Sequence, residues 1–248
     1  VAPAPADEYA FFFTEALAPQ VFRKNGQARF DCQVVAYDKL AQQTLEQYAA
    51  VCLLDPQPMP DNLWQQVTSY VEAGGGLAMF LGENAHTMPD FNRAAPQELL
   101  PVPLELQARA PDGNVYLTPN DSQHPMWAKF RPLRGSVDWE AYPVYRYWRF
   151  GKLVSGAAVV TTFSDQRPAI IERPVKKGRV MTITTPVSEP AELNEDDRWN
   201  LLPTGLEPWP FVMLSNELML YLVGSADEQV NYTVGQPAIV RIEAQQRR

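Results

Sequence analysis

Residues 49–84 are the part of this sequence that most constrains its fold. They run AAVCLLDPQPMPDNLWQQVTSYVEAGGGLAMFLGEN, with apolar runs at 49–55 and 77–81 on either side of a proline-rich turn and a helical pattern at 61–73. Runs that are apolar throughout are typical of strands covered on both faces. Two such strands joined by a helix form the βαβ unit of a parallel sheet. The sequence therefore predicts an α/β fold.

The helix in this unit ends at three consecutive glycines. Residues 61–73 place Leu63, Val67 and Val71 on one apolar face, and Gly74, Gly75 and Gly76 follow directly. At least one of these glycines is expected to have a positive φ, which ends a helix. Dinucleotide-binding glycines follow a strand and precede a helix, and here the order is reversed. We therefore interpret the glycines as a helix stop.

Apolar patterns elsewhere predict further helices and strands around this unit. Helices are expected at residues 8–19, 38–48 and 211–223, a turn of helix within 120–130, strands at 30–37 and 157–163, and a hairpin at 168–186. After Gly224 the apolar residues alternate instead of following a helical period. We expect residues 1–224 to form one domain, and residues 225–248 to be a linker or the first strand of a following β domain.

Composition excludes several classes of function. A net charge of −8 over 248 residues disfavours nucleic acid as a partner. No apolar run reaches the ~18 residues of a membrane span. Cys32 and Cys52 each lie in an apolar run and are expected to be small buried side chains. Two histidines among scattered carboxylates match no metal-ligand spacing, so no metal or other cofactor is expected.

The order of elements resembles the class I glutamine amidotransferase-like superfamily over roughly residues 8–224. Three stretches carry the resemblance: residues 49–84, QHPMW at 123–127, and RPAIIERPVKKGRVMTITTP at 167–186. The resemblance implies a flavodoxin-like three-layer sandwich with a mostly parallel sheet.

The three positions that would carry catalysis in that superfamily hold other residues here. Its members place a Cys just before a Leu-Gly pair, and a His and a Glu in a His-Pro-Glu signature after the paired strands. This sequence has Phe80, Thr185 and Val187 at the matching positions. Amide hydrolysis by a triad needs a nucleophile, a base and a group that orients the base. The resemblance therefore implies a pseudoenzyme.

More closely, the chain resembles degenerate amidotransferase-like domains of large bacterial membrane-anchored proteins, which often accompany von Willebrand A-type domains of the aerotolerance-operon kind. This resemblance implies a non-catalytic domain for ligand or protein binding or for assembly within a larger bacterial envelope protein. Its partners would be proteins or neighbouring domains of the same chain. The implied location is periplasmic or extracytoplasmic, with a cytoplasmic location as the alternative. Two other functions stay open: a hydrolase or amidase with a relocated nucleophile, and a carbohydrate-binding module.

Four polar residues follow the predicted strand ends: Asp55, Glu83, Asn84 and His86. In open α/β sheets, ligands bind beyond the carboxyl ends of the strands, so these side chains are expected to meet at a ligand-binding edge. Short polar residues at such places also cap helices and close loops, and this is their more common role.

An aromatic and arginine-rich segment at residues 139–150 is a candidate interaction surface. On a strand, alternate residues would face opposite sides, which separates Tyr145, Tyr147 and Arg149 from Arg146 and Trp148. One face is expected in the core. The other could anchor a protein or a sugar through its aromatic and Arg side chains, or it could be an edge strand whose Arg stems cover apolar surface.

Overall fold

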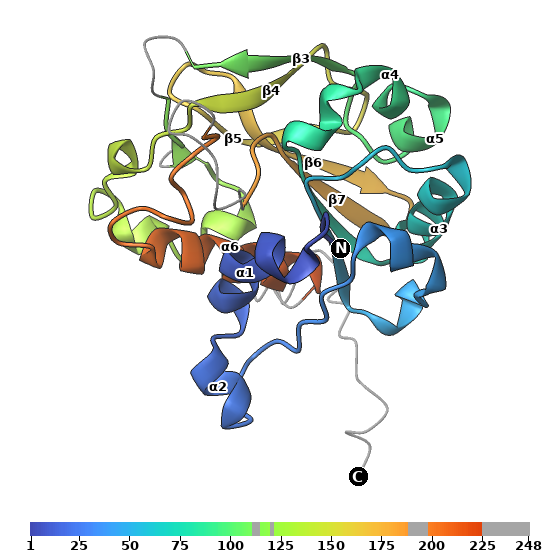
Figure 1. Ribbon diagram of the computed structural model, residues 1–248. Helices are drawn as coiled ribbons and strands as arrows, with labels where there is room; N and C mark the ends of the chain where they lie inside the picture. Colours follow the sequence, from blue (N-terminus) through green and yellow to red (C-terminus); the bar gives the residue numbers. More distant parts are fainter. Residues whose placement is uncertain (111–114, 120–121, 188–197, 225–248) are drawn as a thin grey trace, which may run out of the picture.

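A computed structural model describes residues 1–110, 115–119, 122–187 and 198–224, and its centre is a five-stranded sheet (Figure 1). The strand order is β1-β2-β7-β6-β5. The strands are β1 (Ala50–Leu54), β2 (Gly76–Phe80), β5 (Ala158–Thr162), β6 (Pro168–Val175) and β7 (Gly178–Ile183). β1, β2 and β7 are parallel, whereas β6 is antiparallel to both β7 and β5. All strands except β6 therefore run in one direction, which confirms a mostly parallel α/β sheet.

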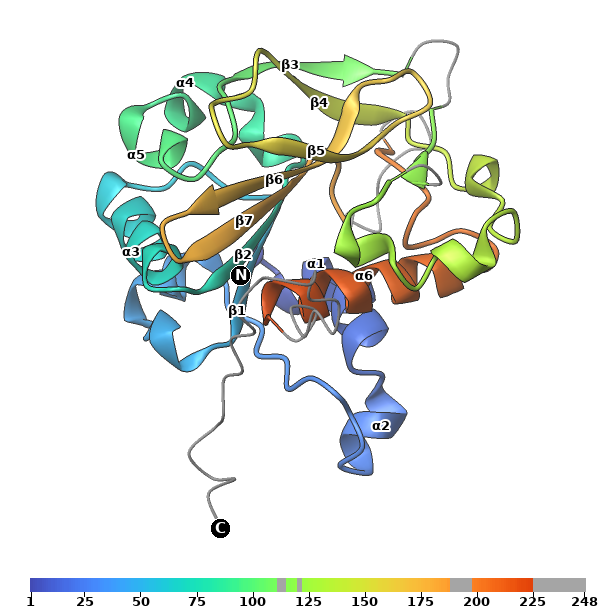
Figure 2. The same cartoon turned by 180° about the vertical axis from the view of Figure 1, so that it is seen from behind.

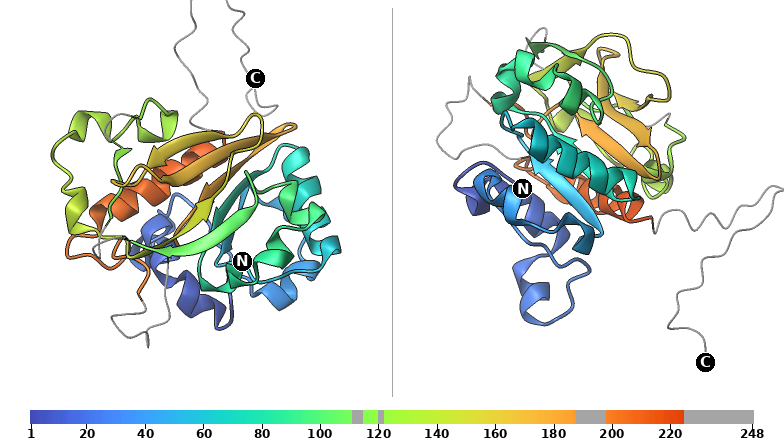
Figure 3. Two further views of the ribbon diagram at one scale, coloured as in Figure 1. Left: turned by 90° about the horizontal axis from the view of Figure 1, so that it is seen from above. Right: turned by 90° about the vertical axis from the view of Figure 1, so that its right-hand side faces the viewer.

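Helices cover both faces of this sheet and make three layers (Figures 1 and 3). α1 (Ala6–Leu17) and α6 (Trp209–Leu222) pack on one face, and α3 (Asp61–Glu72) covers the other. Side chains of β2 alternate between the two cores: Ala78 and Phe80 lie with α1 and α6, while Leu77 and Met79 lie with α3. The apolar run thus reflects burial on both faces, as the sequence predicts.

The glycines after α3 end that helix, as expected. Gly74 has a φ of 122°. A Cβ on Gly76 would lie 2.6 Å from the carbonyl oxygen of Leu222, so this position also has no room for a side chain where α6 ends beside β2.

A second, two-stranded sheet lies over the carboxyl ends of the parallel strands (Figure 2). It pairs β3 (Leu104–Arg109) with β4 (Arg146–Phe150) in antiparallel orientation. Two hydrogen bonds of Trp148 attach it: the backbone N–H donates to the carbonyl of Thr184 at 2.7 Å, and the indole Nε1 donates to the carbonyl of Gly82 at 2.9 Å. β4 is therefore held by residues that follow β7 and β2.

The predicted strand at 30–37 is wrong, and so is the helix at 38–48. Residues 30–36 belong to no strand, apart from one isolated bridge between Ala36 and Ala2. The reason is competition for the edge of β1, because the N–H of Leu54 donates to the carbonyl of Val1 at 2.8 Å. Residues 38–48 contain only 3-10 turns, η1 (Tyr37–Gln42) and η2 (Leu45–Gln47).

The remaining elements are short. They are α2 (Gln20–Lys24), η3 (Glu83–His86), α4 (Met88–Phe91), α5 (Ala94–Gln97), η6 (Pro125–Trp127), η7 (Arg131–Leu133) and η8 (Trp139–Ala141). Within the described ranges, no helix has both the length and the apolar character to cross a membrane. The expectation for residues 225–248 falls outside the described residues.

Candidate functional site

Asp55 and Asn84 meet at the carboxyl ends of β1 and β2, as the sequence predicts. Asp55 is buried and has a φ of 44°, a left-handed conformation that is uncommon for a residue other than glycine. Its Oδ1 accepts a hydrogen bond from the backbone N–H of Asn84 at 2.9 Å, and its Oδ2 accepts one from Asn84 Nδ2 at 2.7 Å. Gly82 lies against this pair, since a Cβ there would be 2.7 Å from the Asp55 carboxyl.

Glu83 and His86 extend the same edge towards solvent through η3. The Glu83 side chain is 61% exposed; its Oε2 accepts a hydrogen bond from Gln107 Nε2 at 3.2 Å and lies 3.9 Å from Arg146 Nη1. His86 Nδ1 lies 2.8 Å from the carbonyl oxygen of Glu83. The structure thus gathers all four predicted residues into one carboxyl-edge cluster. It adds Gln107, which no sequence signal placed there.

The Asp55 carboxyl has a perturbed acidity. Burial raises its pKa to about 6; the hydrogen bonds from Asn84 oppose this rise, and the neighbouring Glu83 carboxylate adds to it. Perturbed carboxyls at strand ends are candidates for functional sites. The hydrogen bonds to Asn84 also give Asp55 a structural role in closing the loop after β2.

We expect Asp55→Asn to change how stability depends on pH. Because the folded-state pKa lies above the ordinary value of 3.8, the folded protein binds the proton more tightly than the unfolded chain. Asp55 therefore makes folding less favourable as pH rises from about 4 to about 6, by up to ~3 kcal/mol. The Asn variant should gain stability relative to the wild type across this window, measured as free energies of unfolding by urea titration at each pH. Parallel profiles for the two proteins would contradict the expectation.

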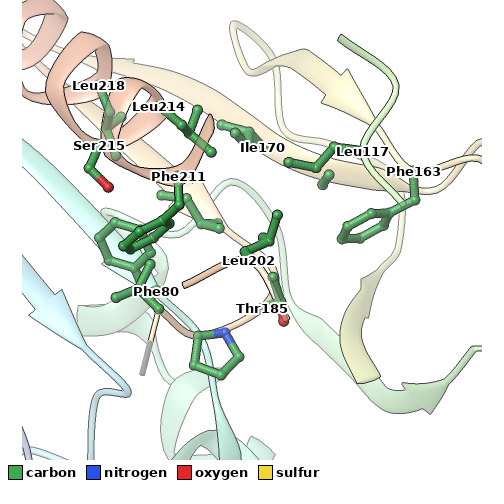
Figure 4. A pocket seen from close by; sticks show the side chains of 14 residues that line it. Phe80, Leu117, Phe163, Ile170, Thr185, Leu202, Phe211, Leu214, Ser215 and Leu218 are labelled. Carbon is green, nitrogen blue, oxygen red and sulfur yellow. The ribbon is translucent and has the colours of Figure 1, made fainter. Parts of the chain in front are cut away.

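Phe80, at the position that the resemblance assigns to the nucleophile, is a core residue. Its ring is 3% exposed and packs edge-to-face on Phe13 of α1, with ring centroids 5.1 Å apart. Phe80 also lines a small apolar cavity of about 20 Å³ next to Phe211 and Leu202 (Figure 4). A cavity of that volume has room for about one water molecule and is too small for a larger ligand.

Thr185, at the position assigned to the histidine, is held in a buried hydrogen-bond network. Its hydroxyl donates to the carbonyl of Arg146 at 3.2 Å and accepts from Asn200 Nδ2 at 2.9 Å. Asn200 Nδ2 also donates to the carbonyl of Pro186 at 2.8 Å. Val187, at the position assigned to the glutamate, is buried and apolar. These contacts connect the end of β7 to β4 and to residue 200.

Neither histidine ring is paired with a nucleophile in the described part of the chain. His86 contacts the backbone of Glu83, and His124 has a structural role at the start of η6, where its Nδ1 accepts from the N–H of Met126 at 3.3 Å. His124 Nε2 lies 3.1 Å from Glu172 Oε2. Across the same residues, no group of three or more His, Cys, Asp or Glu side chains is arranged to hold a metal ion.

The candidate interaction surface is largely buried, which corrects the expectation of an open face. Arg146, Tyr147 and Trp148 are 9%, 3% and 1% exposed, and only Tyr145 and Arg149 are partly accessible. The cause is that β4 is covered on both sides. Tyr147 lies 4.9 Å from the ring of Phe163, and Trp148 belongs to the core under α3.

A second cavity, of about 160 Å³, lies beside the outer edge of β1. Its walls come from α1, residues 30–34, β1 and the end of α6. Cys32 and Cys52 both line it, and both are free. Each residue is partly exposed as a whole, but the Cys52 thiol is buried, so only the Cys32 thiol is more accessible than the sequence predicts. Cys52 Sγ lies 3.5 Å from Met219 Sδ, and burial raises the pKa of Cys52 to about 12. A thiol of such high pKa is a poor nucleophile.

Comparisons with known proteins show similarity of fold. No protein-family model matches the sequence, and no curated protein is significantly similar to it. Cytoplasmic protein STM3548 from Salmonella typhimurium is similar in structure, with a TM-score of 0.62, 16% identity and 86% of each chain covered. Cytoplasmic protein STM1381 from Salmonella typhimurium LT2 has a TM-score of 0.59 at 17% identity, with 87% of each chain covered. At such identities the likeness shows that the α/β fold is shared, and it shows no more than the fold.

Proposed function

We propose that residues 1–224 form a flavodoxin-like domain of the class I glutamine amidotransferase-like kind that binds a ligand or a protein partner and performs no catalysis. One observation carries this proposal: the three positions that the resemblance assigns to the triad are built into the core. Phe80 packs on Phe13, and Val187 is buried. The Thr185 hydroxyl donates a hydrogen bond to the carbonyl of Arg146 and accepts one from Asn200. A base at position 185 would have to replace a hydrogen-bonded core residue.

The binding site that we propose is the carboxyl-edge cluster. Glu83 offers an exposed carboxylate that faces the Gln107 amide and Arg146, and its backbone carbonyl contacts the His86 ring. The hydrogen bonds between Asp55 and Asn84 hold the loop that carries Glu83. The Glu83 carboxylate is the exposed charged acceptor of this edge, so the edge suits a ligand or peptide that brings hydrogen-bond donors or a positive charge. The edge also lies where open α/β sheets place their ligands.

The proposal extends to the chain's setting, a larger bacterial envelope protein with a periplasmic or extracytoplasmic location. The resemblance supports this setting, while the two similar structures are described as cytoplasmic and support the alternative. Fractionating cells that carry the native protein and probing each fraction with an antibody to this domain distinguishes the two locations.

We expect the purified protein to release no ammonia from glutamine above the buffer rate. The measurement is a coupled ammonia assay, with an active glutamine amidotransferase as positive control and a glutamine-analogue electrophile to trap any reactive thiol. Cys32 and Cys52 are the only thiols in the chain, so Cys32→Ser and Cys52→Ser are the matched variants. Ammonia release that either variant abolishes would contradict the proposal and favour a relocated nucleophile.

The two alternative functions have less support in the structure. A relocated hydrolase needs a nucleophile within ~3 Å of a base, and within the described ranges neither histidine ring is hydrogen-bonded to a Ser, Thr or Cys side chain. A carbohydrate-binding module would use exposed aromatic rings, whereas Tyr147 and Trp148 are buried.

A further inference from the structure

Residues 20–30 form an arm that stands away from the body of the protein. They include α2 and the turn after it, and Figures 1 and 2 show α2 beyond α1, away from the sheet. Every residue from 20 to 27 is exposed, and α2 has no buried residue. We call this segment the basic arm.

The basic arm exposes apolar side chains that a short helix normally buries. Val21 is 67% exposed and Phe22 is 49% exposed. Single exposed apolar residues are ordinary on protein surfaces, but here two adjacent ones occupy a protruding helix. Moving both out of water is favourable, so the arm gains free energy from any apolar surface that it can enter.

Charge distinguishes the arm from the rest of the chain. The arm holds Arg23, Lys24 and Arg29 and no Asp or Glu, whereas the whole chain has a net charge of −8. Arg23 pairs with Glu15 of α1, and Arg29 interacts electrostatically with the Glu217 carboxyl of α6, so Lys24 is the cation of the arm best placed for a partner of negative charge. Salt screens charges over about 10 Å at moderate ionic strength. A protruding arm can therefore contact an anionic surface while repulsion between that surface and the acidic rest of the protein stays weak.

We propose that the basic arm binds an anionic lipid surface, with Val21 and Phe22 entering the boundary between head groups and acyl chains and the cations contacting the head groups. A stable protein interface buries about 800 Å² on each partner, more than a five-residue helix offers. A bilayer interface accepts a few apolar side chains flanked by Lys and Arg. This binding is independent of whether residues 1–224 are catalytic.

The test is co-sedimentation of the whole chain with phosphatidylcholine vesicles, with and without phosphatidylglycerol. We expect binding only to vesicles that contain phosphatidylglycerol, and weaker binding as salt is raised. Lys24→Glu and Arg29→Glu should each lower the partition coefficient at least about fivefold. Phe22→Ser should also lower it, since the apolar contact is lost.

Matched variants outside the arm are the controls. Lys39→Glu makes the same change of charge at an exposed residue of η1, and Leu206→Ser removes a fully exposed apolar side chain elsewhere. Both should bind as the wild type does. Failure to bind either kind of vesicle, or equal losses in the arm and control variants, would overturn the proposal. Binding to poly-glutamate but not to phosphatidylglycerol vesicles would assign the arm to an acidic protein and would overturn it as well.

Discussion

Replacing Phe80 by Ala is expected to lower the free energy of unfolding by ~3–5 kcal/mol, the range for a buried aromatic side chain. Phe80 is 3% exposed, lies in the middle of the sandwich and packs edge-to-face on Phe13 of α1. The substitution removes that ring contact and enlarges the small cavity that Phe80 already lines. Since β2 is bonded to strands on both sides, the sheet cannot collapse to fill the space.

Urea or thermal unfolding of the purified variant measures this loss. Phe11→Ala is the matched control, because Phe11 lies on the same helix as Phe13 and is 54% exposed. A surface change of this kind is expected to stay within about 0.5 kcal/mol. Equal effects of the two substitutions would mean that Phe80 is open to solvent and that its position is available for a site.

Trp148→Ala is expected to destabilise the protein by a similar ~3–5 kcal/mol. Trp148 is 1% exposed, and its indole Nε1 donates to the carbonyl of Gly82 at 2.9 Å. The substitution therefore removes a large core side chain and a hydrogen bond that holds the second sheet to the loop after β2. It should also loosen that loop, which carries Glu83 and Asn84.

Trp148→Phe separates these two contributions. The ring remains, but the Gly82 carbonyl loses its partner, and an unpaired buried carbonyl costs about 1–3 kcal/mol. Trp209→Ala at the start of α6 is the control, because Trp209 is 37% exposed and should cost clearly less than Trp148. If Trp148→Ala proved as mild as Trp209→Ala, then β4 would not be a buried strand.

The aromatic segment at residues 139–150 shows why the alternation of side chains along a strand does not by itself identify an exposed surface. Alternation assigns Tyr147 and Trp148 to opposite faces, and that much is correct. Which face meets solvent depends on what packs against it, and here Phe163 covers one side while the core under α3 covers the other. No residue within 139–150 carries that information.

The predicted strand at 30–37 failed for a related reason. The segment is apolar enough for a strand, but a strand also needs a free edge to pair with. Val1 takes up the outer edge of β1 at Leu54, so the segment makes only the single bridge at Ala36. Local composition cannot tell which of two segments will occupy an edge.

By itself, the sequence determined the features that depend on neighbouring residues along the chain. These are the strand–helix–strand unit of β1, α3 and β2, the stop at Gly74, the hairpin of β6 and β7, and the meeting of Asp55 with Asn84 at the ends of two parallel strands. Apolar period, glycine conformation and the geometry of parallel strands are enough for each of them.

Only the tertiary structure decided which side chains are buried in the core and which are exposed. It placed Gln107 beside Glu83, bonded Thr185 to Asn200, and buried Trp148 against Gly82 in the loop after β2. Each of these contacts joins segments that lie at least 15 residues apart in the chain. The physical reason is that burial and hydrogen-bond pairing are properties of the packed layers, whereas periodicity describes a single segment before it meets its neighbours.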